Sequence, residues 1–146
     1  MGNYYTILTN TGQSLLASAL TQGTPLKLTQ VAFGDGNGSD VTPSASQTAL
    51  VHEVYRTSIQ NLSTDPNNVN NIIVEATIPT TVGGFYIREV GIFDNNNNLI
   101  AVGNYPDTLK SDPTILAQEL YTRITLTVSN TSSVTYLIDP TVCANE

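Results

Sequence analysis

Apolar and polar residues alternate along most of this chain, which is the pattern of β-strands that bury one face. The clearest example runs from Phe85 to Phe93, and an Asp-Asn turn leads to a second apolar stretch from Leu99 to Val102. We predict a β-hairpin over Val82–Tyr105, because asparagine tolerates the left-handed conformations that hairpin loops need. Both faces of the first strand are largely apolar, so we expect this strand to lie at the centre of a sheet.

The same alternation continues in other segments, which are separated by polar stretches rich in Gly, Pro and Asn. Such stretches form turns, so we expect loops at Gly34–Ser46, Ser63–Asn71 and Pro106–Thr114. The strands on either side of Ser63–Asn71 form a second predicted hairpin, Tyr55–Ile78. The segment Tyr4–Leu8 is short and fits either a strand or a docking arm. The remaining predicted strands are Leu26–Phe33, Tyr55–Leu62, Ile72–Ile78, Ile115–Val128 and Val134–Ile138.

Two helices are predicted in the N-terminal half. Gly12–Gln22 carries leucine and alanine at helical spacing, Thr9 precedes it as a capping side chain, and Gly23 follows where a helix C-cap belongs. A short helix is expected over Gln47–Glu53, with Ala49, Leu50 and Val54 facing inward. The sequence therefore predicts an α+β domain, in which two short helices in the N-terminal half accompany a predominantly antiparallel β-sheet.

Composition describes a single domain with few charges. The 146 residues suffice for one domain that spans residues 1–146, and only 12% of them are charged. Polar surfaces of low charge suit proteins that pack into larger assemblies. The net charge of −7 would repel a phosphate backbone, so we expect no nucleic-acid partner. No apolar run approaches the ~20 residues of a membrane helix, and we recognise no signal peptide, so we expect no membrane partner.

Candidate catalytic and metal-binding residues are few. The Asp35–Asp40 segment superficially resembles a calcium loop, but Asp40 and Ser46 stand where an EF-hand has Gly and Glu. His52 is the only histidine, and the single cysteine, Cys143, fits synthesis in a reducing compartment. We interpret the Asp35–Asp40 segment as a flexible turn and predict no catalytic residue, no metal site and no cofactor.

Glu89 is the most informative charged residue, because it lies in the middle of the predicted central strand. An unpaired buried carboxylate costs several kcal/mol, so Glu89 needs a partner. Arg88 falls on the opposite face of an alternating strand and is not expected to serve. Three partners stay open: a basic group such as Arg56 or Arg123, backbone N–H groups, or a neighbouring subunit. Alternation places five residues on the same face of this strand: Phe85, Ile87, Glu89, Gly91 and Phe93.

Six motifs follow one another along the chain, and together they resemble the N-terminal domain of phage tail-collar fibre proteins. This family includes tail fibres of contractile-tailed phages and of phage-tail-like bacteriocins. Its most recognisable stretch corresponds here to Gly83, Gly84, Phe85, Arg88, Glu89, Gly91 and Phe93. The motifs are Tyr4–Gly12 (YYTILTNTG), Val31–Gly38 (VAFGDGNG), Gln47–Arg56 (QTALVHEVYR), Gly83–Asp94 (GGFYIREVGIFD), Leu99–Gly103 (LIAVG) and Ile138–Val142 (IDPTV).

The resemblance implies a non-enzymatic structural protein of the virion, synthesised in the host cytoplasm and located in the phage tail. In the family this domain attaches to the baseplate, and the fibres are commonly homotrimers. The chain ends at Glu146, soon after the domain and without a shaft or tip. This predicts a short fibre, or an adaptor that joins a further fibre protein to the baseplate, and leaves contact with a host receptor open.

The expected partner surface combines the N-terminal segment with the Gly34–Asp40 loop. Its candidate residues are Tyr4, Tyr5, Asp35, Asn37 and Asp40. A different class of function also stays open: a small β-rich module that binds a receptor or a carbohydrate, because exposed Tyr, Asn and Asp side chains could bind sugars.

Overall fold

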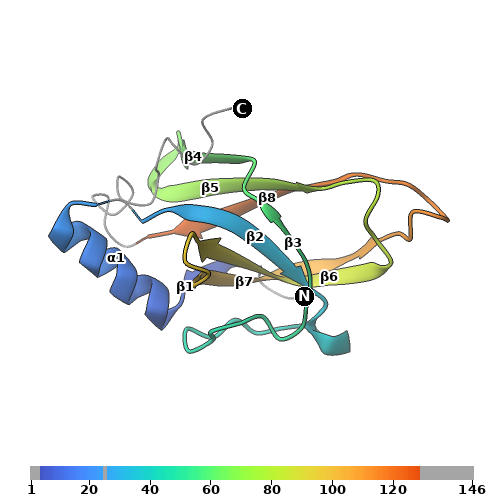
Figure 1. The fold of residues 1–146 in the computed structure, drawn as a ribbon, viewed down its shortest axis with the longest axis horizontal. Helices are drawn as coiled ribbons and strands as arrows, with labels where there is room; N and C mark the ends of the chain where they lie inside the picture. Colours follow the sequence, from blue (N-terminus) through green and yellow to red (C-terminus); the bar gives the residue numbers. More distant parts are fainter. Residues whose placement is uncertain (1–3, 25, 129–146) are drawn as a thin grey trace.

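The computed structural model describes residues 4–24 and 26–128, and in them the chain forms two antiparallel β-sheets and one α-helix (Figure 1). The predicted strand Val134–Ile138 and Cys143 lie outside the described residues. The larger sheet has the order β1-β7-β6-β2-β3, and the smaller sheet has the order β4-β5-β8. The strands are β1 (Thr6–Leu8), β2 (Leu28–Gly34), β3 (Glu53–Ser58), β4 (Asn61–Asp65), β5 (Asn68–Ile78), β6 (Phe85–Asp94), β7 (Leu99–Lys110) and β8 (Leu120–Thr127).

The main hydrophobic core lies between the two sheets. Val31 and Phe33 of β2 and Val90 of β6 contribute to it from the larger sheet, and Val74 and Leu126 contribute from the smaller one. These side chains are almost completely buried, as the alternating pattern requires of residues on an inward face. The prediction that the strand beginning at Phe85 is central is confirmed, because β6 pairs with β2 on one side and β7 on the other.

Helix α1 (Asn10–Gln22) begins and ends where its capping residues predict. The Thr9 hydroxyl accepts a hydrogen bond from the Gly12 N–H at 2.9 Å and donates one to the Leu99 carbonyl at 2.6 Å. Gly23 closes the helix in the left-handed conformation, with φ of 71°. The fully buried Thr9 therefore both caps the helix and attaches it to β7.

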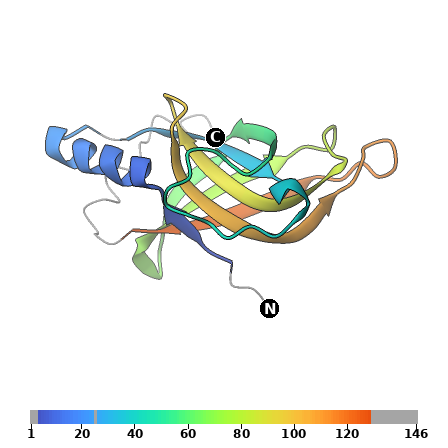
Figure 2. The same cartoon turned by 90° about the horizontal axis from the view of Figure 1, so that it is seen from below.

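A long loop, residues 35–52, covers the outer face of the larger sheet (Figure 2). It contains the 3₁₀ turn η1 (Gly36–Gly38). Leu50 of this loop packs into a second apolar cluster with Phe93 of β6 and Leu99 and Val102 of β7. The central strands are thus buried on both faces, one by the smaller sheet and the other by the loop, which explains their apolar character on both sides.

The expected helix Gln47–Glu53 does not form, and this corrects the predicted fold class. The structure is mostly β, with two antiparallel sheets and a single α-helix, instead of an α+β domain with two helices. The backbone N–H groups of Val51 and His52 donate to the Glu89 side chain in place of helical carbonyls. A tertiary partner therefore takes the hydrogen bonds that a helix would need. Leu50 does face inward as predicted, but from a loop, whereas Ala49 is exposed and Val54 is only partly buried.

The predicted hairpin Tyr55–Ile78 is divided between the two sheets. The Ile59 N–H donates to the Thr29 carbonyl beside the larger sheet, and the Gln60 N–H donates to the Glu75 carbonyl of the smaller sheet. The chain changes sheets between these two residues, so β3 and β4 are separate strands. Only β4 and β5 form a hairpin. The polar residues predicted as a long turn are mostly strand, because β4 extends to Asp65 and β5 begins at Asn68.

The predicted boundaries around Pro106 are also wrong. Strand β7 continues through Pro106 to Lys110, and β8 starts only at Leu120. Proline is tolerated because the pairing between β6 and β7 shifts register here. Ile87 pairs with Thr108 and Glu89 pairs with Asn104, so the residues between them are out of register. Proline in a sheet is found at such irregularities, where no ladder hydrogen bond is lost.

Candidate functional site

Glu89 holds both ends of the loop that covers the larger sheet. Its side chain is fully buried and accepts hydrogen bonds from three backbone N–H groups. Two come from the far end of the loop, Val51 and His52, each at 2.8 Å, and one comes from Gly36 at its near end, at 3.3 Å. Of the partners left open by the sequence, backbone N–H groups are therefore the ones used. Hydrogen bonds to a charged acceptor are among the stronger ones in proteins.

The register shift in β6 explains how Glu89 reaches the loop. Ile87 belongs to the core between the sheets, whereas Gly91 and Phe93 face the cluster beneath the loop. The predicted alternation from Phe85 to Phe93 is therefore broken between Ile87 and Glu89. As a result Arg88 and Glu89 both bind the same loop, although the sequence placed them on opposite faces.

Gly34 is required at the end of β2 because Glu89 lies against it. A Cβ atom at position 34 would lie 2.3 Å from the Glu89 Oε2 atom and 2.6 Å from the His52 carbonyl oxygen. Both distances are far below van der Waals contact. The absence of a side chain at Gly34 is thus what allows the carboxylate to fit between the strand and the loop.

Arg88 connects the near end of the loop to β7. Its guanidinium donates a hydrogen bond to the Asp35 carbonyl at 2.8 Å and lies 3.4 Å from the Asp107 carboxylate. The guanidinium also lies over the Tyr86 ring, 4.7 Å from its centre, a geometry that attracts a cation. Tyr105, Pro106 and Asp107 belong to the out-of-register part of β7, so the irregularity places a carboxylate next to Arg88.

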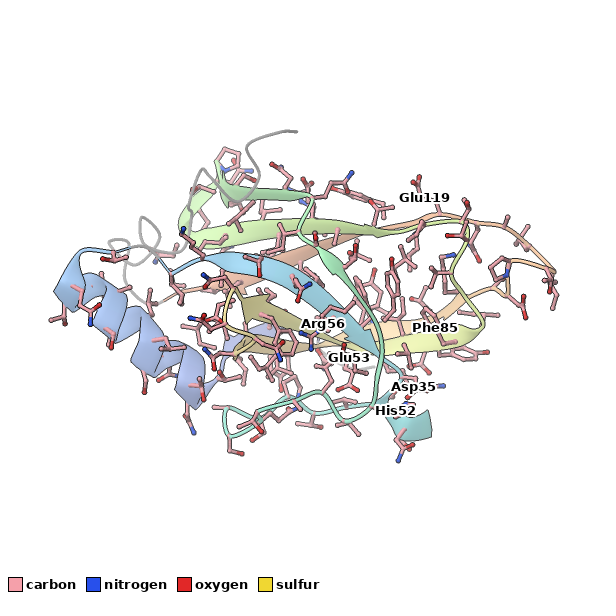
Figure 3. All side chains as sticks on the ribbon, in the orientation of Figure 1. Asp35, His52, Glu53, Arg56, Phe85 and Glu119 are labelled. Carbon is pink, nitrogen blue, oxygen red and sulfur yellow. The ribbon has the colours of Figure 1, made fainter. Side chains whose placement is uncertain are left out.

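The two ends of the loop are also joined by Asp35 and His52, which lie next to each other (Figure 3). The His52 Nδ1 atom lies 2.8 Å from the Asp35 carboxylate. Burial alone would raise the pKa of Asp35. Hydrogen bonds from His52 and the Asn37 N–H, with electrostatic interactions from His52 and Arg88, instead hold this pKa below its ordinary value. The ionised form of Asp35 is therefore the one that the fold stabilises.

Asp40 has the opposite electrostatic environment. Its carboxyl group shares a hydrogen bond with Asp107, and this bond together with the negative charge of Asp107 raises the pKa of Asp40. Asp40 is exposed and borders a hollow of about 330 Å³. This hollow, which we call the arm hollow, is lined by Tyr4, Tyr5, Asp40, Val41, Thr42, Arg88, Asn104 and Tyr105.

The N-terminal arm, residues 4–8, lies along β7 and presents its two tyrosines to solvent. The Tyr5 N–H donates to the Asn104 side chain at 2.8 Å, and the Asn104 N–H donates to the Tyr5 carbonyl at 3.2 Å. A Cβ atom at Gly103 would lie 2.4 Å from the Thr6 hydroxyl, so glycine allows the arm to lie this close. The Tyr4 and Tyr5 side chains remain 53% and 43% exposed, respectively. Exposed aromatic rings on a hydrogen-bonded segment are typical of binding surfaces.

The structure brings three of the five predicted partner residues together around the arm hollow, namely Tyr4, Tyr5 and Asp40. Asn37 lies in the η1 turn and Asp35 directly precedes it. Asn37 is exposed and has a φ of 57°. The sequence did not identify Asn104, Tyr105 and Asp107 as neighbours of these residues. In the sequence, Pro106 indicated a loop over this segment. The out-of-register strand that forms there instead has no clear pattern in a single amino-acid sequence.

The remaining motif residues have structural contacts. Gly83 lies against the Ser111 backbone, and the Gly84 N–H donates to the Lys110 carbonyl at 2.7 Å. Gly91 lies beneath Leu50 and Leu99. The Phe93 ring carries the Arg56 guanidinium 3.8 Å above its centre, and Arg56 also forms two 2.9 Å hydrogen bonds with Glu53. Arg56 is therefore committed to partners other than Glu89. Phe85 pairs with Lys110 at the start of β6.

The described part of the chain has neither a membrane-spanning helix nor a cluster of metal-binding side chains. No helix there is long and apolar enough to cross a membrane. Within residues 4–24 and 26–128, no group of three or more His, Cys, Asp or Glu side chains could hold a metal ion.

Comparison with known proteins identifies the family. The profile of the family described as phage tail-collar fibre protein, N-terminal, matches residues 1–146. A probable tail fiber protein of Escherichia phage P2 is 39% identical over 140 residues, which cover 94% of this chain and 21% of the relative. The chain thus spans about a fifth of the length of this curated relative, and no solved structure matches it. The resemblance seen in the motifs is confirmed: this chain belongs to the phage tail-collar fibre protein N-terminal family.

Proposed function

We propose that residues 1–146 form a non-catalytic attachment domain, which joins a tail fibre to the baseplate of a phage tail. The observation that carries this proposal is the match to an N-terminal fibre-protein family along the whole chain. The relative is itself described as a probable tail fiber protein. A structural protein that functions in an assembly needs exposed binding residues, and the arm supplies Tyr4 and Tyr5.

The partner surface of this proposal is the arm together with the start of the covering loop. Asp40, Arg88 and Asp107 give this surface charges of both signs around the arm hollow. Glu89 and Arg88 attach the loop to the sheet, so the loop reaches a partner already ordered. Preordered binding surfaces lose less conformational entropy on association. We propose the baseplate as the partner, a homotrimer as the assembled state, and the host cytoplasm as the place of synthesis.

The test uses tail particles purified from a phage mutant that lacks this fibre gene. The purified chain is mixed with these fibreless tails, and co-sedimentation measures binding. We expect saturable binding to the fibreless tails. Wild-type tails should not bind the chain, because their sites are already filled. Absence of binding to fibreless tails would overturn the attachment function. Light scattering on the same protein tests the trimer, and a monomer at micromolar concentration would contradict it.

A second candidate function is binding of a receptor or a carbohydrate. The observation that favours it is the arm hollow, in which Tyr4, Tyr5 and Tyr105 lie beside the polar Asp40 and Asn104. Aromatic rings next to hydrogen-bonding side chains suit a sugar. A glycan array probed with the purified chain separates the two functions. Specific glycan binding without binding to fibreless tails would favour this second function.

A further inference from the structure

The outer face of the larger sheet carries an exposed apolar pair where β6 begins and β7 ends. Tyr86 of β6 pairs in register with Leu109 of β7, and residues that pair directly across two antiparallel strands have side chains on the same face. Phe85 and Ile87, on either side of Tyr86, face the core between the sheets, so Tyr86 and Leu109 point outward. Their side chains are 44% and 49% exposed, respectively. Tyrosine is enriched at protein interfaces, so this pair offers a partner an apolar area to bury.

Arg88 and Asp107 connect this pair to the arm hollow. The Arg88 guanidinium lies over the Tyr86 ring, and its Nε atom lies 3.4 Å from an oxygen of the Asp107 carboxylate. The Arg88 side chain is 15% exposed, whereas that of Asp107 is 50% exposed. The positive charge of Arg88 is therefore mostly covered and is committed to partners within the chain. The carboxylate of Asp107 still faces solvent and can accept further hydrogen bonds.

Asp40 places a second carboxylate beside Asp107. The two carboxyl groups share a hydrogen bond, and Asp40 is exposed at the border of the arm hollow. Within residues 4–24 and 26–128, Asp40 forms no salt bridge within 4.0 Å. Two carboxylates thus lie together, and the guanidinium of Arg88 beside them already pairs with Asp107. Because like charges at hydrogen-bonding distance repel each other, this place lacks one positive charge.

A basic side chain suits this place better than an anion or a metal ion. An anion would be repelled by Asp40 and Asp107, and Arg88 is too covered to offset them. A calcium ion takes about six to eight oxygen ligands, and two carboxylates supply only part of such a set. A lysine or arginine side chain needs hydrogen-bond acceptors for its charged end and an apolar surface for its stem. Asp40 and Asp107 are the acceptors, and Tyr86 and Leu109 form the apolar surface.

The overall charge of the chain favours the same class of partner. Five Lys and Arg residues stand against 12 Asp and Glu residues, which gives the net charge of −7. A negatively charged protein attracts a basic surface over a distance and raises the rate at which the two meet. The local excess of one carboxylate and the charge of the whole chain therefore have the same sign.

We propose that Asp40, Arg88, Asp107, Tyr86 and Leu109, which we call the acidic patch, bind a lysine or arginine side chain of the baseplate protein to which the fibre attaches. The charged end of that side chain pairs with Asp40 and Asp107, and its stem packs on Tyr86 and Leu109. This inference rests on the proposed attachment function and names the chemistry of the partner. The incoming positive charge also offsets the repulsion between the two carboxylates, which the free chain retains.

Asp40→Asn tests the charge, again with fibreless tails as the probe. Asparagine keeps the size of the side chain and removes one negative charge. Glu119→Gln is the matched control, because it removes the same charge from an exposed carboxylate far from the Asp35 end of the covering loop (Figure 3). We expect Asp40→Asn to weaken binding by about tenfold or more, and Glu119→Gln to leave it within about twofold.

The stability of the isolated chain distinguishes a binding role of Asp40 from a structural one. Asp40→Asn removes a repulsion, so the free energy of unfolding in urea should stay the same or rise. A larger fall than Glu119→Gln gives would mean that the chain's own residues pair with Asp40, and it would overturn the proposal. Asp40→Lys places a positive charge next to Asp107 within the chain, where the partner's charge belongs. It should weaken binding more than Asp40→Asn does, and equal binding by the two variants would contradict the proposal.

Tyr86→Ala tests the apolar half of the acidic patch. Tyr121→Ala is its control, because Tyr121 is 53% exposed on β8 of the smaller sheet. We expect Tyr86→Ala to weaken binding by about tenfold and Tyr121→Ala to leave it within about twofold. Circular dichroism and thermal unfolding verify that the variants fold. Equal effects of the two alanine substitutions would remove Tyr86 from the patch.

Salt and chelation identify the class of ligand. Binding of the wild-type chain should weaken as the salt concentration rises, and binding of Asp40→Asn should depend on salt less steeply. Binding that is lost in EDTA and restored by calcium would mean that a metal ion occupies the patch, which would overturn the proposal. If fibreless tails do not bind the wild-type chain at all, the attachment function and the acidic patch both fail. If they bind the wild type and Asp40→Asn equally well, only the acidic patch fails.

Discussion

Replacing Glu89 with glutamine tests the role of the buried carboxylate with almost no change in shape. The Oε1 atom of Glu89 accepts one backbone N–H bond, from Val51, and the Oε2 atom accepts two, from His52 and Gly36. Glutamine has one oxygen and one NH₂ group. If its oxygen takes the position of Oε2, its NH₂ group meets the Val51 N–H, and two donors then face each other.

The cost of Glu89→Gln follows from these three bonds. Losing the bond from Val51 and leaving its partly buried N–H unpaired costs about 1–3 kcal/mol. The two remaining bonds change from a charged to a neutral acceptor, which weakens each by roughly 1 kcal/mol. We expect the free energy of unfolding to fall by about 3–5 kcal/mol, and the melting temperature to fall by roughly 6–20 °C for a domain of this size.

Urea unfolding followed by circular dichroism measures this loss. The matched control is Glu53→Gln, because Glu53 makes a partly exposed ion pair with Arg56, whose loss costs about 1 kcal/mol or less. Hydrogen exchange should also show faster exchange at Gly36, Val51 and His52 in the Glu89 variant. A Glu89→Gln protein within about 0.5 kcal/mol of the wild type would refute the idea that the carboxylate holds the loop.

Three further predictions concern the loop and the arm. Leu50→Ala should lower the free energy of unfolding by about 2–3 kcal/mol, because it empties part of the cluster under the loop; urea unfolding measures this, and an equal effect of the exposed control Val51→Ala would contradict it. Gly103→Ala should push the arm away from β7 and raise hydrogen exchange at residues 4–8, whereas unchanged exchange would show that the arm does not need this glycine. The native state holds the pKa of Asp35 below its unfolded value, so this stabilisation is present above about pH 4 and is lost as the pH falls below that. Asp35→Asn should therefore flatten the loss of stability between about pH 4 and pH 2 in acid titrations, and an unchanged slope would contradict the assigned shift.

Alternation of apolar and polar residues was enough to predict most of the strands. It placed β2, β5 and β6 within a few residues of their observed bounds, and it identified β6 as central. The helix α1 was predicted equally well, because Thr9 and Gly23 are local capping signals. Elements whose stability is determined by their own residues and immediate neighbours can be read from one sequence.

Elements that depend on distant partners could not be predicted in this way. Gln47–Glu53 has residues compatible with a helix, but Glu89, 36 or more residues away in sequence, binds its backbone N–H groups instead. The change of sheet between Ile59 and Gln60 has the same origin, because their N–H groups bind different sheets. Local patterns carry no information about such long-range hydrogen bonds.

The candidate site shows the same division. From the sequence came the chain's family, the requirement that Glu89 have a partner, and the choice of Tyr4, Tyr5 and the Asp35–Asp40 turn as partner residues. The tertiary structure decided which of the possible partners Glu89 uses, and it joined Asp40 to Arg88 and Asp107. It also placed the N-terminal arm beside β8 of the smaller sheet. Strand edges and register shifts are set by which strands pair, and pairing is a property of the whole folded chain.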